Sequence, residues 1–104
     1  MRNLLLAATL VCAPIAASAA TIRVAITNYA FVPAQISVHP GDTVVWTNHD
    51  AVPHTVTALD GGFASGALAT GARFRQRFTS VGKVRYHCAI HPEMQGTVVV
   101  ASPG

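Results

Sequence analysis

A cysteine, a histidine and a methionine follow one another at intervals of three residues in the segment YHCAIHPEM, as Cys88, His91 and Met94. A thiolate, an imidazole and a thioether are ligands that soft and borderline metals prefer. Cys88 closes an expected strand and Gly96 precedes the next one, so His91 and Met94 lie on the short connection between them. We therefore predict that the three side chains converge on one metal ion, with a fourth ligand from elsewhere in the chain.

Four other histidines are candidates for the fourth ligand. His39 lies at a Pro-Gly turn and His49 in a polar stretch, so we expect both to face solvent. His87 is next to Cys88 in an extended strand, which directs its side chain to the opposite face. His54 begins a new strand after a proline and is the best candidate on position, although position alone does not decide the choice.

The elements that would hold these ligands are strands. Short alternating or β-branched stretches, separated by turn residues, predict strands near 22–26, 35–38, 44–47, 55–57, 73–78, 84–88 and 97–100. No window has helical periodicity long enough for a packed helix. Seven or eight short strands with regular turns indicate an all-β fold, a small antiparallel sandwich in a single domain.

The first 19 residues have the pattern of a cleaved secretory signal peptide. An apolar run over 4–11 follows a basic start and precedes the small residues Ala17, Ser18 and Ala19. Neither this run nor any later stretch reaches the roughly 20 apolar residues of a membrane span. Cys12 lacks the small residue that usually precedes a lipid-modified cysteine, so we expect no lipid anchor. The predicted mature protein is a soluble, exported domain over residues 20–104.

The net charge and the cysteine content narrow the range of functions that the chain could have. The net charge of +3 falls to +2 when Arg2 leaves with the signal, and Arg73, Arg75 and Arg77 are most simply the outer face of one strand. We therefore expect no nucleic-acid binding. Cys88 is the one cysteine after processing, and a free thiol in an oxidising compartment needs burial, a partner or a metal.

The stretches VVWTN, PHTV and YHCAIHPEMQGTVVV resemble the cupredoxins, or type 1 blue copper proteins, and most of all their amicyanin group. The resemblance covers roughly residues 44–100. In that family the first histidine ligand follows a tryptophan by eight residues, which relates Trp46 to His54. The Cys-x-x-His-x-x-Met spacing is the shortest ligand loop of the family.

The resemblance implies a Greek-key β-sandwich with one type 1 copper per chain. It implies that His54, Cys88 and His91 bind copper in a near-trigonal plane, with Met94 as a long axial ligand. The implied function is electron transfer in the periplasm, by a monomer that cycles between Cu(II) and Cu(I). Its partners would be a redox protein that donates electrons and one that accepts them, such as a c-type cytochrome or a dehydrogenase.

Two other functions compete with electron transfer. An enzyme with a second copper centre would need more histidines than the three that remain, which are scattered, so we expect no enzyme. Storage or delivery of Cu(I) would use the same signal and ligands. Storage favours several thiol or thioether sites, whereas the predicted mature chain has one cysteine and one methionine. Electron transfer is therefore preferred, with copper storage or delivery as the alternative.

Two positions depart from the pattern of the family. Thr55 occupies the place of an asparagine that commonly ties the two ligand loops together. Glu93 stands where amicyanins carry an aromatic ring, beside a rim that we expect Pro53, Ile90 and Pro92 to form around His91. We hypothesise that His91 is the electron port and that Glu93 favours a partner with a basic surface.

Overall fold

A computed structural model describes residues 18–103 of the chain, and within that range it contains strands and turns but no helix. The predicted signal peptide, residues 1–19, therefore lies almost wholly outside the described residues. The eight strands are β1 (Thr21–Thr27), β2 (Ala30–Val32), β3 (Gln35–Val38), β4 (Thr43–Asn48), β5 (Thr57–Ala58), β6 (Arg73–Arg77), β7 (Gly82–His87) and β8 (Gln95–Val100).

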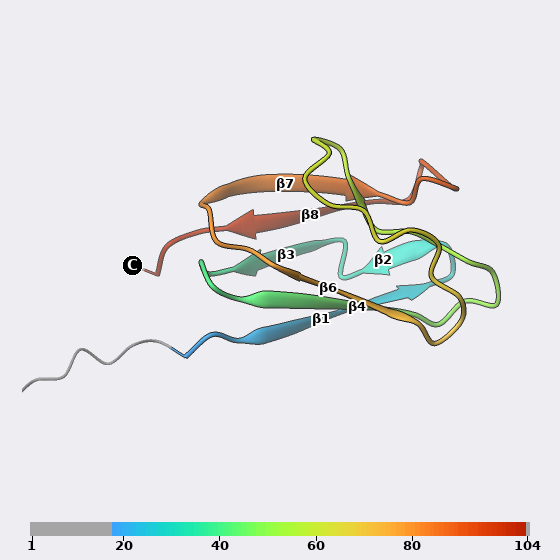
Figure 1. Ribbon diagram of the computed structural model, residues 1–104, viewed down its shortest axis with the longest axis horizontal. Helices are drawn as coiled ribbons and strands as arrows, with labels where there is room; N and C mark the ends of the chain where they lie inside the picture. Colours follow the sequence, from blue (N-terminus) through green and yellow to red (C-terminus); the bar gives the residue numbers. More distant parts are fainter. Residues whose placement is uncertain (1–17, 104) are drawn as a thin grey trace, which may run out of the picture.

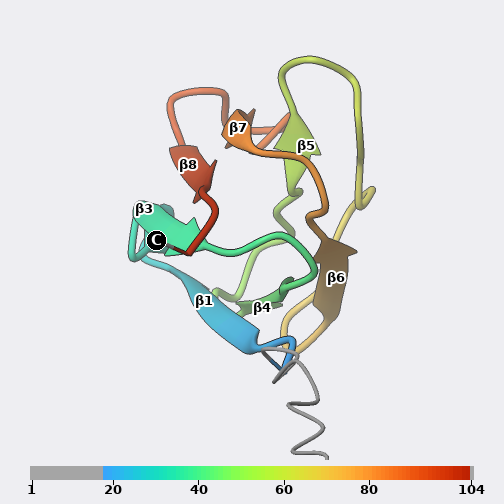
Figure 2. The ribbon, with the colours of Figure 1, turned by 90° about the vertical axis from the view of Figure 1, so that its left-hand side faces the viewer.

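The strands form two four-stranded sheets that pack face to face. One sheet has the order β2-β1-β4-β6 and the other β3-β8-β7-β5, and Figures 1 and 2 show them as two layers. The predicted sandwich of seven or eight strands is thus confirmed. Two of the six strand pairs, β1 with β4 and β3 with β8, are parallel. In the first case this is because the chain leaves the sheet for β3 before it returns as β4.

The core lies between the sheets and follows the two-residue period of the strands. In β4, Val44, Trp46 and Asn48 point inward and are fully buried. Each large apolar side chain buried in this way contributes about 1.5–3 kcal/mol of transfer free energy. On the edge strand β6 the exposed residues alternate with half-buried ones. This confirms that the arginines at 73, 75 and 77 form an outer face.

One strand was not predicted from the sequence. The short strand β2 pairs with β1 in a hairpin in which Thr27 lies opposite Ala30, so that two residues make the turn. These residues, Asn28 and Tyr29, have φ angles of 52° and 58°. Positive φ at both central positions is the geometry of a tight hairpin turn, which usually contains glycine. The pair Asn-Tyr carries no such signal.

Three connections that matter for the site meet at one end of the sandwich. The β1–β2 turn, the β4–β5 connection and the β7–β8 loop lie together, at the end opposite the C-terminus (Figure 1). Cys88, His91 and Met94 come from the third connection, and His54 comes from the second. In the part of the chain that the structure describes, no helix is long and apolar enough to cross a membrane.

Candidate metal centre

The β7–β8 loop is held in shape by its own backbone. Strand β7 ends at His87 and β8 begins at Gln95, so the loop has just the length that separates Cys88 from Met94. The Cys88 N–H donates to the Met94 carbonyl at 3.0 Å, and the Met94 N–H donates to the His91 carbonyl at 2.9 Å. These bonds close the loop on itself. The three predicted ligands of the segment are therefore fixed relative to one another.

His54 is held in place both through its backbone and through its side chain. Its backbone pairs with Leu68 through two hydrogen bonds, of 3.2 and 2.7 Å, in an isolated β-bridge. Its side chain is fully buried, and Nε2 lies 2.7 Å from the carboxylate Oδ2 of Asp50. An ionised carboxylate only accepts hydrogen bonds, so Nε2 is the donor. The Nδ1 atom, which faces Cys88 Sγ at 3.7 Å, is then the ring nitrogen left to bind a metal.

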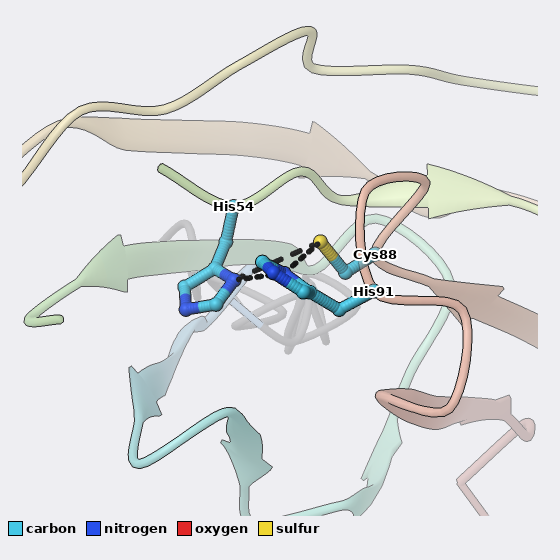
Figure 3. Close-up of side chains that lie close together, drawn as sticks. All are labelled: His54, Cys88 and His91. Carbon is cyan, nitrogen blue, oxygen red and sulfur yellow. Dashed lines mark hydrogen bonds between the residues drawn. The ribbon is translucent and has the colours of Figure 1, made fainter. Parts of the chain in front are cut away.

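Three donor atoms converge at this end of the sandwich. Cys88 Sγ lies 3.7 Å from His54 Nδ1 and 3.8 Å from His91 Nδ1, and the two Nδ1 atoms are 3.2 Å apart. Figure 3 shows the three side chains pointing toward one another. A triangle with these sides has its equidistant point about 2.1 Å from each atom, which is close to metal–nitrogen and metal–sulfur bond lengths of about 2.0–2.3 Å. The three residues thus fit a single metal ion.

Met94 is the fourth predicted ligand. It is buried, and it belongs to the same apolar cluster as Cys88. Its backbone is bonded to both Cys88 and His91. Met94 is therefore held next to the ligand loop by its packing and by its backbone. The donor–donor distances given for the site join only Cys88, His54 and His91.

The electrostatics of the site favour the thiolate form of Cys88. Burial by itself raises the pKa of the thiol, but hydrogen bonds to sulfur outweigh it. The Thr55 N–H donates to Sγ at 3.3 Å, and the imidazoles of His54 and His91 lie beside the sulfur; together these neighbours lower the pKa to about 6. The thiolate is the form that binds a metal.

Thr55 connects the two ligand segments twice. Its N–H donates to Cys88 Sγ, and its Oγ1 accepts the Ala89 N–H at 2.7 Å. The same hydroxyl lies 2.9 Å from Thr57 Oγ1. The sequence left open whether a threonine could replace the asparagine of the family at this position. The hydroxyl does span the gap between the β4–β5 connection and the ligand loop.

Asp50 links a third segment to the site. Its Oδ1 accepts the Asn28 N–H at 2.7 Å, and its Oδ2 accepts the Tyr29 N–H at 2.9 Å as well as His54 Nε2. The Tyr29 backbone bond is the main reason why the pKa of Asp50 is lowered. The Tyr29 ring then lies edge-on to His54 and His91, with centroid distances of 5.2 and 5.0 Å. The β1–β2 turn therefore covers the two histidines.

Sequence reasoning missed both Asp50 and Tyr29. The one signal for Asp50 was its place four residues before His54, whereas nothing local distinguishes Tyr29.

The remaining histidines stay outside the cluster. His39 and His49 are exposed, as predicted, and His87 is half-buried in β7 opposite Thr57. Among residues 18–103, the group of His54, Cys88 and His91 is the one set of three or more potential ligands that come close enough together to hold a metal. Pro53, Ile90, Pro92 and Glu93, which we expected to form a rim, are exposed, and His91 is partly exposed.

Comparisons with known proteins agree with this geometry. A family model described as a cupredoxin-like domain matches residues 2–100. Amicyanin from Paracoccus denitrificans is 38% identical over 71 residues, which are 64% of this chain and 54% of that protein. The match thus spans about half of the length of that relative.

Two solved structures share the fold. A purple cupredoxin from Nitrosopumilus maritimus superposes with a TM-score of 0.71 at 31% identity, over 77% of this chain and 99% of that one. A copper-containing nitrite reductase from Thermus scotoductus SA-01 superposes with a TM-score of 0.74 at 28% identity. That match covers 81% of this chain but 23% of the reductase.

Proposed function

Since this chain belongs to the cupredoxin-like family, we propose that it carries single electrons between redox proteins at one type 1 copper ion bound by His54, Cys88, His91 and Met94. The family and the described residues together give the arrangement of a type 1 copper site. The observation that carries the proposal is the convergence of Cys88 Sγ and the two Nδ1 atoms on a point about 2.1 Å from each.

The residues of the chain supply what such a site needs. Copper, when bound, provides the one-electron change between Cu(II) and Cu(I). Cys88 provides a thiolate near neutral pH. His54 is held by Asp50 and by the backbone of Leu68, and Thr55 ties the ligand loop to the β4–β5 connection. Donors fixed in this way move little when the charge at the site changes, which favours fast electron exchange.

We infer that electrons enter and leave at the exposed edge of His91. The rim of Pro53, Ile90 and Pro92 offers an apolar surface to a partner such as a c-type cytochrome or a dehydrogenase, and Glu93 adds one negative charge. Because rim charges act mainly on association rate, Glu93 favours a partner with a basic surface. Glu93→Gln should slow electron exchange with a cationic redox reagent at low ionic strength. Equal rates for the two proteins would remove this role for Glu93.

We place the protein in the periplasm as a soluble monomer. The support is the signal-like pattern of residues 1–19, which predicts export of a domain over residues 20–104. Fractionation of cells that produce the full chain tests the location, and a mass measurement tests removal of the signal.

A redox titration tests electron transfer against copper storage. The purified protein is loaded with one equivalent of Cu(II), reduced with ascorbate and reoxidised with ferricyanide over several cycles. An electron carrier takes up one electron per chain in every cycle and retains its copper. Release of copper on reduction, or uptake of several Cu(I) ions per chain, would favour delivery or storage. Turnover of nitrite by the loaded protein would favour an enzyme.

A further inference from the structure

A buried carboxylate far from the metal centre holds the start of the folded chain. Asp42, between β3 and β4, is 4% exposed. Its Oδ1 accepts the Ala20 N–H at 2.8 Å, and its Oδ2 accepts the His39 N–H at 2.8 Å. These two bonds hold the pKa of Asp42 below its ordinary value, so the buried group is a carboxylate at neutral pH.

Ala20 is also held through its carbonyl. The Thr43 N–H donates to the Ala20 carbonyl at 3.0 Å, beside the parallel pairing of β1 with β4 that begins at Thr21 and Thr43. Within residues 18–103, the hydrogen bonds that join the start of the chain to the fold begin at Ala20. Ser18 and Ala19 are exposed coil. In the described part of the chain, the hydrogen-bonded fold therefore starts at Ala20.

The same residue follows the predicted cleavage point. The small residues Ala17, Ser18 and Ala19 are typical of the site before a signal-peptidase cut, and Ala20 is the next residue. A boundary expected from sequence and a boundary seen in the hydrogen bonds thus coincide. The backbone nitrogen that touches Asp42 is the one that cleavage would free.

We propose that Asp42 is a binding site for the α-ammonium of the processed N-terminus. A signal-peptidase-type protease adds water across the Ala19–Ala20 peptide bond, which leaves a carboxylate on Ala19 and an ammonium on Ala20. The neutral N–H···carboxylate bond then becomes an ion pair. Charge-assisted bonds of this kind are stronger than those of a neutral donor. Maturation would add stability to the domain at the end opposite the metal centre.

His39 and Arg77 are the two basic side chains nearest to this pair. His39 Nδ1 lies 4.0 Å from Asp42 Oδ2 on a side chain that is 62% exposed. The Arg77 Nε–H donates to the Gly41 carbonyl at 3.2 Å, next to the turn. Asp42 is the carboxylate that faces Ala20, so the α-ammonium gains an anionic partner and its pKa rises above the usual 7.7–8.0. The added stability is present below about pH 8 and is lost as the pH rises through the raised pKa.

The melting temperatures of four copper-free chains, compared as in a double-mutant cycle, test the proposal independently of electron transfer. One chain begins at Ala20 and another retains Ser18 and Ala19, each with and without Asp42→Asn. We expect the chain that begins at Ala20 to melt about 4 °C higher at pH 7. This difference should vanish at pH 10 and in the Asp42→Asn pair. Equal melting temperatures, or a difference that survives Asp42→Asn, would overturn the proposal.

Two further measurements apply even where Asp42→Asn fails to fold. Sequencing of the exported protein should give Ala20 as its first residue. An NMR titration of that protein should show the pKa of the α-amino group above its ordinary range. Another first residue, or an α-amino group with an ordinary pKa, would each contradict the proposed role of Asp42.

Discussion

Thr55 provides the sharpest test of how the metal centre is held together. Thr55→Val keeps the shape of the side chain and the backbone N–H that reaches Cys88 Sγ, but it removes the hydroxyl. Two hydrogen bonds are lost, to the Ala89 N–H at 2.7 Å and to Thr57 Oγ1 at 2.9 Å. Each such bond has a net value of about 1 kcal/mol.

We expect the loss in the free energy of unfolding to be smaller than the combined value of the two bonds. Ala89 is exposed, so water can satisfy its N–H after the substitution. We therefore expect Thr55→Val to lower the free energy of unfolding by about 1 kcal/mol, or the melting temperature by about 4–8 °C. Copper affinity should fall by about 10–100-fold, as is typical when a group that orients a ligand is removed.

Thermal unfolding of the copper-free protein and competition with a chelator measure the two effects. Thr55→Ser keeps the hydroxyl and is the matched control. Thr57→Val removes the neighbouring hydroxyl and leaves the bond to Ala89 in place, and Thr55→Asn introduces the residue common in the family. If Thr55→Val matched Thr55→Ser in both stability and copper affinity, the bridge between the two ligand segments would have no energetic role.

Three further predictions concern Asp50, Gly96 and Asp42. Asp50→Asn removes the anionic acceptor of His54 Nε2, so copper affinity measured by chelator competition should fall about 10–100-fold; unchanged affinity would show that Asp50 does not position the ring. Gly96→Ala would place a methyl group in steric overlap with the hydroxyl edge of the buried Tyr86 ring, so the free energy of unfolding should drop by about 1–3 kcal/mol in a denaturant titration, and an unaltered midpoint would contradict the packing. The pKa of Asp42 is lowered in the fold, so its contribution to stability is present above about pH 4 and is lost as the pH falls through the folded value. Melting curves between pH 7 and pH 2 should show a smaller acid loss for Asp42→Asn than for the unmodified chain, and parallel curves would argue against this role.

The parts of the site that depend on local spacing could be predicted from the sequence. Cys88, His91 and Met94 lie on one short loop, so their intervals alone indicated a common metal. His54 lies more than thirty positions earlier, and its selection depended on the resemblance to cupredoxins. The structure brings its Nδ1 within 3.7 Å of Cys88 Sγ.

The parts that depend on distant contacts could not be predicted. Asp50 reaches Asn28 and Tyr29 across 22 and 21 positions of the sequence. That contact requires a turn with two positive φ angles; Asn28 is a residue type that tolerates such an angle, but Tyr29 gives no sign of it. The strands were predicted well where alternation was strong, as in β1 and β3. Strand β2, with three residues, is too short to show a period.

The most direct test of the central claim is the visible absorption spectrum of the protein with one equivalent of Cu(II), recorded beside that of Cys88→Ser. We predict an intense blue band that arises from the bond between copper and the Cys88 thiolate, is bleached by ascorbate, and is absent from the variant. A colourless copper complex, or a blue band that persists in Cys88→Ser, would contradict the assignment of a type 1 site to His54, Cys88, His91 and Met94.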